Sequence, residues 1–167
     1  SIKSCDRDYN QGLAHFCSEK WTIFNQNNSE LPSNLVKVLL NDGNGGIWIG
    51  TAFMRVNLIH LSADNQWKIF ELKLNSQVRD IKALANDSSG GLWIATFMNG
   101  LVHLSPHEKE KWLFLNTENT GLPSNQLSSL VDDSHSGLWI GTNGGIAHLT
   151  LSSEAQINRY FKFKNPP

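Results

Sequence analysis

The six tryptophans of this chain fall into two interleaved series that share one period. Within each series the spacing is 45 or 46 residues; the members are Trp21, Trp67 and Trp112, and then Trp48, Trp93 and Trp139. A unit that recurs at this spacing constrains the fold strongly, because one short unit must bury its apolar face against its neighbours. The period is longer than that of a leucine-rich repeat, and the segments lack the 3.6-residue periodicity of helical repeats.

One unit can be divided into strands and turns. Residues 35–40 form a short apolar run rich in branched side chains, which favours a buried strand. Residues 41–46 follow as a turn, since Asp and Asn bond their own backbone and Gly tolerates positive φ. The remaining strands predicted in this unit are residues 47–51, 57–61 and 67–70.

Four short antiparallel strands in each unit are typical of a β-propeller blade. We therefore predict an all-β chain with about 3.5–4 four-stranded blades. The predicted divisions are a partial blade at 1–24, with its last two or three strands, and blades at 25–70, 71–115 and 116–163. Residues 12–16, 21–24 and 157–163 are expected to be strands, and 2–5 the remnant of another.

This blade number is at the lower limit for a closed ring, since propellers usually have four to eight blades. The sequence leaves three arrangements open. The chain is a piece of a longer propeller, or two copies form one ring, or one copy closes as a strained four-bladed ring. We favour completion by a homodimer partner or by the remainder of a larger propeller, because an open arc exposes apolar faces.

Several motifs recur in a fixed order. Residues 21–24, 31–34 and 48–51 read Trp-Thr-Ile-Phe, Leu-Pro-Ser-Asn and Trp-Ile-Gly-Thr, and residues 112–142 repeat most of this pattern. The series resembles the two-component regulator propeller repeat over residues 12–150. The middle unit departs from the family pattern, because Ser-Gln-Val-Arg stands at 76–79 where the other two units have Leu-Pro-Ser-Asn. The resemblance implies a non-catalytic domain that senses or binds a ligand in the periplasm, although a cytoplasmic location stays open.

Histidine and aspartate repeat with the same period. The positions are His15, His60, His103 and His148, and Asp42, Asp87 and Asp133. Equivalent positions in successive blades lie too far apart to share a metal, whose ligands must lie within about 2.0–2.3 Å. We predict that the histidines pack and form hydrogen bonds between blades, and that the aspartates close Asx turns rather than bind calcium. No metal site is predicted.

The departures from the repeat are the best candidates for function. The loop between the second and third strands holds both methionines, and it opens on the same face as the stretch leading into the innermost strand. Exposed apolar anchors with a few polar groups suit a ligand or partner surface, although the Phe-Met pairs could equally cap the core. The predicted ligand-binding residues are Asn34, Arg79, Asn125, Phe53, Met54, Arg55, Phe97 and Met98.

Composition and missing motifs exclude other classes. With 14 basic and 15 acidic residues the formal charge is −1, which argues against nucleic-acid binding. No apolar run reaches the length of a membrane span, and no nucleotide, cofactor or catalytic-thiol motif is present. Cys5 and Cys17 flank a predicted strand and could form a disulfide in an oxidising compartment.

Three functions follow from this pattern. The first is a binding module for a small molecule, a glycan or a protein. The second is an assembly scaffold in which half-propellers dimerise. The third is a propeller lyase, which ranks last because the ends of the innermost strands offer Asn, Arg and either Lys37 or Lys82 rather than an acid–base pair.

Overall fold

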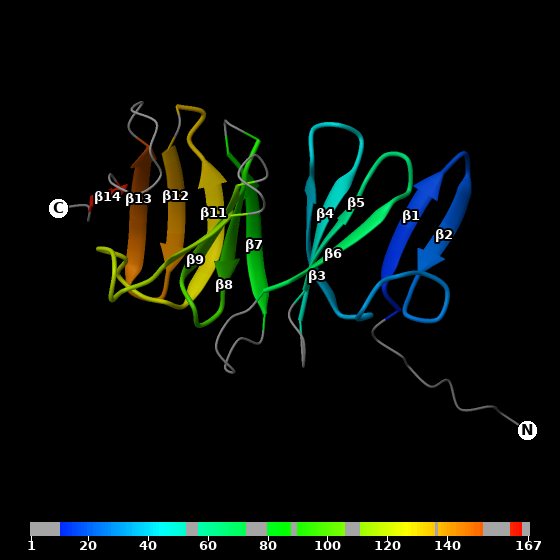
Figure 1. Ribbon diagram of the computed structural model, residues 1–167, viewed down its shortest axis with the longest axis horizontal. Coiled ribbons are helices and arrows are strands. Elements are labelled where there is room, and N and C mark those ends of the chain that lie inside the picture. The colour runs from blue at the N-terminus through cyan, green and yellow to red at the C-terminus, as the bar shows by residue number, and fades with distance from the viewer. Residues whose placement is uncertain are drawn as a thin grey trace, which may run out of the picture.

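The computed structural model describes residues 11–52, 57–72, 80–87, 90–105, 111–135, 137–151 and 161–164. Within these ranges the chain contains 14 strands and no helix. Figure 1 shows the strands gathered into sheets that stand side by side, from β1 and β2 at one end to β14 at the other. The predicted all-β propeller architecture is therefore confirmed.

The strands form one hairpin and three four-stranded sheets, all antiparallel and each in sequence order. The hairpin consists of β1 (Leu13–Cys17) and β2 (Lys20–Phe24). The first full sheet consists of β3 (Val36–Asn41), β4 (Ile47–Thr51), β5 (Asn57–Leu61) and β6 (Trp67–Glu71). The second consists of β7 (Ile81–Asn86), β8 (Leu92–Thr96), β9 (Leu101–Ser105) and β10 (Lys111–Leu115). The third consists of β11 (Leu127–Asp132), β12 (Gly137–Thr142), β13 (Gly145–Leu151) and β14 (Phe161–Lys164).

The first strands of the three full sheets lie next to one another: β7 contacts both β3 and β11. Each of these inner strands shifts register once against its partner, between Val36 and Val38, Ile81 and Ala83, and Leu127 and Ser129. Such a bulge adds one residue to the strand and re-aims its side chain. The inserted residues are Lys37, Lys82 and Ser128, all of them exposed.

Apolar side chains fill the space between each pair of successive sheets. The core between the first and second full sheets contains Leu58 and Phe70 from one side and Ile94 and Leu104 from the other. The core between the second and third contains Trp93, Leu101, Ile140 and Leu149. Both faces of a middle sheet are therefore buried, which explains why its strands do not alternate cleanly between apolar and polar residues.

The strand ends define two faces of the molecule. We call the end that carries the β3–β4 and β5–β6 turns, at 41–46 and 62–66, together with Asp87, Gly91, Asp133 and Gly137, the turn face. The opposite end carries the segments 25–35, 97–100, 116–126 and 143–144, and we call it the loop face. Figure 1 shows the β3–β4 and β5–β6 turns together at the upper edge of the sheets.

Most predicted strands appear within one or two residues of their expected bounds. The strand expected over 157–163 corresponds to β14, Phe161–Lys164, which pairs with β13, and residues 157–160 lie outside the described residues. The strand remnant expected over 2–5 lies outside the described residues.

Candidate functional site

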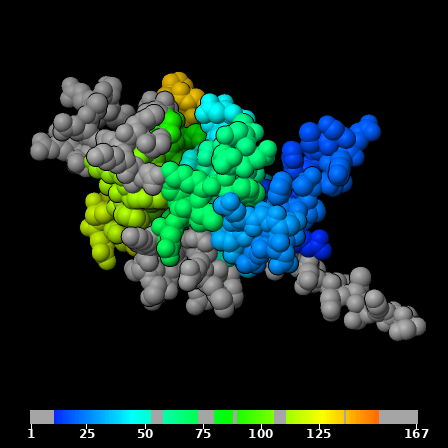
Figure 2. Space-filling model, turned by 45° about the vertical axis from the view of Figure 1, so that its right-hand side comes forward, coloured from blue at the N-terminus to red at the C-terminus, as the bar shows by residue number. Residues whose placement is uncertain are grey.

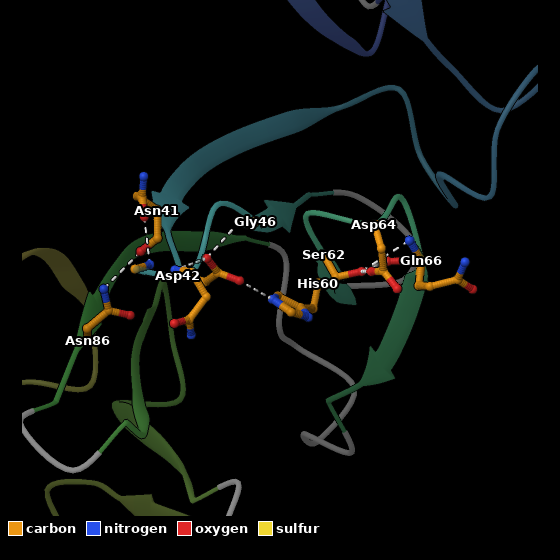
Figure 3. A network of polar contacts seen from close by, with 10 residues as sticks. Asn41, Asp42, Gly46, His60, Ser62, Asp64, Gln66 and Asn86 are labelled. Carbon is orange, nitrogen blue, oxygen red and sulfur yellow. Dashed lines mark hydrogen bonds and ion pairs between the residues drawn. The ribbon is translucent and has the colours of Figure 1, made fainter.

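An aspartate and a histidine of the same sheet pair on the turn face in each of the three full sheets. The aspartate follows the inner strand and the histidine lies on the third strand, and both lie at the turn-face end of their sheet. Figure 3 shows the pair of the first full sheet, Asp42 and His60. The histidine Nε2 lies 2.8, 2.5 and 2.7 Å from an aspartate Oδ2 in the pairs Asp42–His60, Asp87–His103 and Asp133–His148. For His60, His103 and His148 the predicted hydrogen bond between blades is therefore wrong, because each ring bonds to an aspartate of its own sheet.

The second carboxylate oxygen holds the turn. Oδ1 of Asp42 accepts hydrogen bonds from the backbone N–H groups of Asn44 and Gly46, each at 2.8 Å. This is the Asx turn that the sequence predicted. A Cβ on Gly46 would lie 2.5 Å from Oδ2 of Asp42, and Gly91 and Gly137 meet their aspartates even more closely. Glycine recurs here because no other residue leaves room for the carboxylate.

These contacts lower the pKa of two of the carboxyl groups. Burial raises the pKa of Asp42, but hydrogen bonds from Asn44, His60 and Gly46 together outweigh it and lower the pKa. The hydrogen bond from the backbone N–H of His135 is the main cause of the lowered pKa of Asp133, followed by the bond from His148. Both carboxyl groups are thus held in the charged form, which accepts hydrogen bonds best.

A tryptophan of the neighbouring strand covers each histidine ring. The ring centroids are 4.4, 4.2 and 4.2 Å apart in the pairs Trp48–His60, Trp93–His103 and Trp139–His148. The indole ring packs against the face of the imidazole, and the aspartate carboxylate bonds to its edge, so the two contacts together fix its orientation. No group of three or more His, Cys, Asp or Glu side chains within the described ranges could hold a metal ion. We therefore assign the Asp–His–Trp units to the framework of each sheet.

Backbone contacts hold the loop face together, both within a sheet and between successive sheets. The N–H of Ala52 donates to the carbonyl of Leu35, and Ala52 also forms an isolated bridge with Asp80 of the next sheet. Further along, the N–H of Phe97 donates to Asp80 at 3.1 Å, and the N–H of Gly100 donates to Asn125 at 3.0 Å. The turn between the second and third strands thus lies on the same face as the stretch that leads into the inner strand, as the sequence predicted, and the Ala52–Asp80 bridge and the Gly100–Asn125 bond extend these contacts to the next sheet.

Two of the predicted ligand-binding residues, Asn34 and Asn125, lie within this loop face and bond to their own loops. Oδ1 of Asn34 accepts a hydrogen bond from the N–H of Gln26 at 2.9 Å. Oδ1 of Asn125 accepts the equivalent bond from the N–H of Thr117 at 2.8 Å. Each amide therefore ties the entry of its loop to the exit, and its carbonyl oxygen is already engaged.

Phe97 and Met98 form an exposed apolar pair beside charged groups. Both side chains are 36% exposed, although every residue of the two strands that flank them, β8 and β9, is buried. Nζ of Lys82 lies 4.7 Å from the centroid of the Phe97 ring and 2.7 Å from Oδ2 of Asp80. The bulge of β7 aims this lysine, and we call Asp80, Lys82, Phe97 and Met98 the loop-face cluster.

The sequence did not single out Asp80. Its signal is the Asp-x-Lys spacing at the start of an inner strand, which becomes meaningful only once the bulge at Lys82 is known. The other predicted residues of this face, Phe53, Met54, Arg55 and Arg79, lie outside the described residues. Cys17 carries an exposed thiol on β1, and its predicted partner Cys5 also lies outside the described residues, so the disulfide stays a prediction.

Comparison with known families confirms the resemblance that the motifs indicated. Residues 30–53 and 121–144 match the model of the two component regulator propeller family. The matched segments run from the Leu-Pro-Ser-Asn loops through the Asp turns to the ends of β4 and β12. These two segments of the chain are therefore similar to repeats of this family. A search of curated protein sequences returns no significant match.

Solved structures support the same fold. The extracellular domain of BT3049 from B. thetaiotaomicron, described as a hybrid two component system, matches with a TM-score of 0.61 and 25% identity over 83% of this chain and 17% of that one. PorZ, a surface component of the type-IX secretion system of Porphyromonas gingivalis, matches with a TM-score of 0.57 and 20% identity over 78% of this chain and 20% of that one. The chain thus spans about a fifth of the length of each structure. No helix among the described residues is long and apolar enough to cross a membrane.

Proposed function

We propose that this chain is a non-catalytic part of an extracytoplasmic sensor propeller that binds its ligand on the loop face. The observation that carries the proposal is the loop-face cluster, where an aromatic ring, a thioether and an ion pair meet at one exposed point. The family repeats and the likeness to an extracellular domain of a two component system support the sensor role.

The chemistry of the cluster favours a ligand with both an apolar or ring face and a polar rim. An exposed aromatic ring offers a stacking surface, while Lys82 offers donors for a hydroxyl or carboxylate group. Asp80 offers acceptors at the same place. A sugar or a small organic acid would satisfy these groups, and a protein loop with the same groups would do so over a larger area.

The strand framework makes the cluster a suitable binding platform. The backbone of Phe97 is fixed to Asp80, and the hydroxyl of Thr96 donates to Gly100 at 2.8 Å, which closes the turn between β8 and β9. Functional groups on a rigid support lose little freedom when a ligand binds. In the third full sheet the equivalent turn consists of Asn143 and Gly144 alone, so the third sheet carries no such cluster.

The test is a thermal-shift screen with mono- and oligosaccharides, amino acids and dicarboxylates, followed by titration calorimetry of each compound that raises Tm. We expect Phe97→Ala and Lys82→Ala to weaken binding of such a compound at least about tenfold, which corresponds to about 1.4 kcal/mol. The matched control is Ile69→Ala, since Ile69 is 45% exposed but lies on β6, away from the cluster. Unchanged affinity in both cluster variants, or a panel without a binder, would count against the proposal.

A further inference from the structure

The outer face of the third full sheet exposes side chains that its neighbours bury. Trp93 of the second sheet is 2% exposed, whereas Trp139, its equivalent in the third, is 46% exposed. Val131 and Ile146 share the face of Trp139 and are 61% and 57% exposed. We call Val131, Trp139 and Ile146 the trailing face.

Their equivalents in the second sheet show what such a face normally contacts. Ala85, Trp93 and Leu101 occupy the same register positions and are all buried. They belong to the core that the third sheet completes with residues such as Ile140 and Leu149. A face of this kind is therefore covered by the next sheet along the chain.

The hairpin of β1 and β2, at the other end of the molecule, exposes the side that in a full sheet packs against the preceding sheet. Phe16 and Trp21 are paired across β1 and β2, with ring centroids 4.9 Å apart, and are 55% and 64% exposed. Ala14 lies on the same side and is also exposed. Figure 2 shows the hairpin, in dark blue, standing out from the body of the molecule. We call Ala14, Phe16 and Trp21 the leading face.

Register equivalence again identifies its usual contact. In the second sheet the corresponding positions are Val102, Leu104 and Trp112, which pack in the core shared with the first sheet. In that core they meet Trp48 and Leu58, which are the equivalents of Trp139 and Ile146. Leading and trailing faces are thus the two halves of one interface, repeated between the sheets inside the chain.

We propose that a second copy of this chain covers the trailing face with its leading face. The contact continues the outer-strand part of the sheet-to-sheet interface already present inside each copy, because the hairpin supplies the equivalents of a sheet's third and fourth strands. The interface is heterologous, so it produces either a closed ring or an open filament. Two copies arranged in this way bring six four-stranded sheets and two hairpins around one axis, and propellers typically have four to eight blades.

The test is size-exclusion chromatography with light scattering on the chain and two variants, Trp139→Asp and Trp21→Asp. We expect the unmodified chain to show twice its 18.7 kDa mass and each variant alone to show the single mass. Mixing the two variants leaves one intact interface, so an equimolar mixture should form a one-to-one pair. Ile69→Asp is the matched control, since it charges an equally exposed apolar residue of an interior sheet and should leave the doubled mass unchanged.

Three results would overturn the proposal. The first is a monodisperse monomer of the unmodified chain at micromolar concentration and above, which would mean that something other than a second copy covers these faces. The second is a doubled mass in Trp21→Asp alone, because a trailing face that pairs with itself does not need the leading face. The third is a mixture that stays monomeric. Circular dichroism of each variant establishes that it is folded, which the exposure of Trp21 and Trp139 leads us to expect.

Discussion

The second and third full sheets have nearly the same sequence pattern and different surroundings. Both carry an aspartate that holds a glycine turn, a histidine bonded to that aspartate, and a tryptophan over the histidine. In the second sheet the unit is enclosed, with side-chain exposures of 6% for His103 and 3% for Asp87. In the third sheet the corresponding values are 19% for His148 and 17% for Asp133.

The difference teaches that the repeat specifies local geometry independently of burial. The Asp–His distance is similar in both sheets although only one of them is covered on both sides. Hydrogen bonds within a hairpin depend on the turn and the register, which are local. The stabilisation that each unit contributes depends on its neighbours, because burial of apolar area provides most of the free energy of folding.

The largest expected effect is on the two equivalent tryptophans, Trp93 of the second sheet and Trp139 of the third. Trp93→Ala should lower the free energy of unfolding by about 3–5 kcal/mol, because it leaves a cavity between two sheets. Trp139→Ala should lower it by less, about 1–2 kcal/mol, because about half of the side chain is already in solvent. Urea unfolding of both variants in the Trp21→Asp background measures the difference without association. Equal losses would mean that the exposed tryptophan is covered in the folded monomer.

Removing the aspartate of an Asp–His pair should also cost more stability in the second sheet than in the third, but the difference should be smaller than for the tryptophans. Asp87→Ala removes a buried acceptor and leaves the ring of His103 and the N–H of Gly91 without it, which should cost about 2–3 kcal/mol. Asp133→Ala should cost less, because water can replace the carboxylate at an exposed turn. Chemical denaturation of the two variants in the Trp21→Asp background provides the comparison without association. A larger loss in Asp133→Ala would mean that this aspartate is covered in the folded monomer.

The smallest effect should be the dependence of stability on pH. The folded pKa values of Asp42 and Asp133 lie below the ordinary value of 3.8. Between the folded and unfolded pKa the unfolded chain binds more protons, so the stability rises with pH through this window. The stabilisation should be fully present above the unfolded value, near pH 4, and should disappear as the pH falls through the folded values.

The measurement is the free energy of unfolding in urea across the acidic range. The double variant Asp42→Asn and Asp133→Asn should show a shallower loss between pH 4 and lower pH than the unmodified chain, because both groups that titrate there are gone. An identical slope in the two proteins would mean that other carboxyl groups control the acid response.

Much of the fold could be predicted from the sequence. Two tryptophan series in phase identify the strand order and the propeller unit, because a side chain that packs between sheets must recur whenever the sheet does. The turn residues were equally informative, since Asx turns and close-packed glycines depend on neighbouring residues only. Strand bounds followed from the short apolar runs between these turns.

The partners of the repeated histidines could not be predicted as readily. The separation between aspartate and histidine is 18, 16 and 15 residues in the three sheets, since the turn between the second and third strands differs in length. A fixed spacing would have suggested a pair. The available signal was that an aspartate and a histidine recur together in every unit. A contact between them can be inferred only once the strand pairing is known.

The candidate site was predictable in location but not in composition. The sequence placed Phe97 and Met98 on the face shared with Asn34 and Asn125. It could not reveal that the two asparagine carbonyls bond to their own loops. Nor could it reveal that a bulge brings Lys82 to the Phe97 ring and the carboxylate of Asp80. These facts depend on the path of the backbone between strands.

By itself the sequence determined the repeating unit, its strand order and its turns, because these arise from interactions within about 45 residues. Only the tertiary structure decided which copies of that unit are covered and which are exposed. Trp93 and Trp139 occupy equivalent positions, and no local rule distinguishes them. The distinction comes from the number of neighbouring sheets, which is a property of the assembled arc rather than of any one repeat.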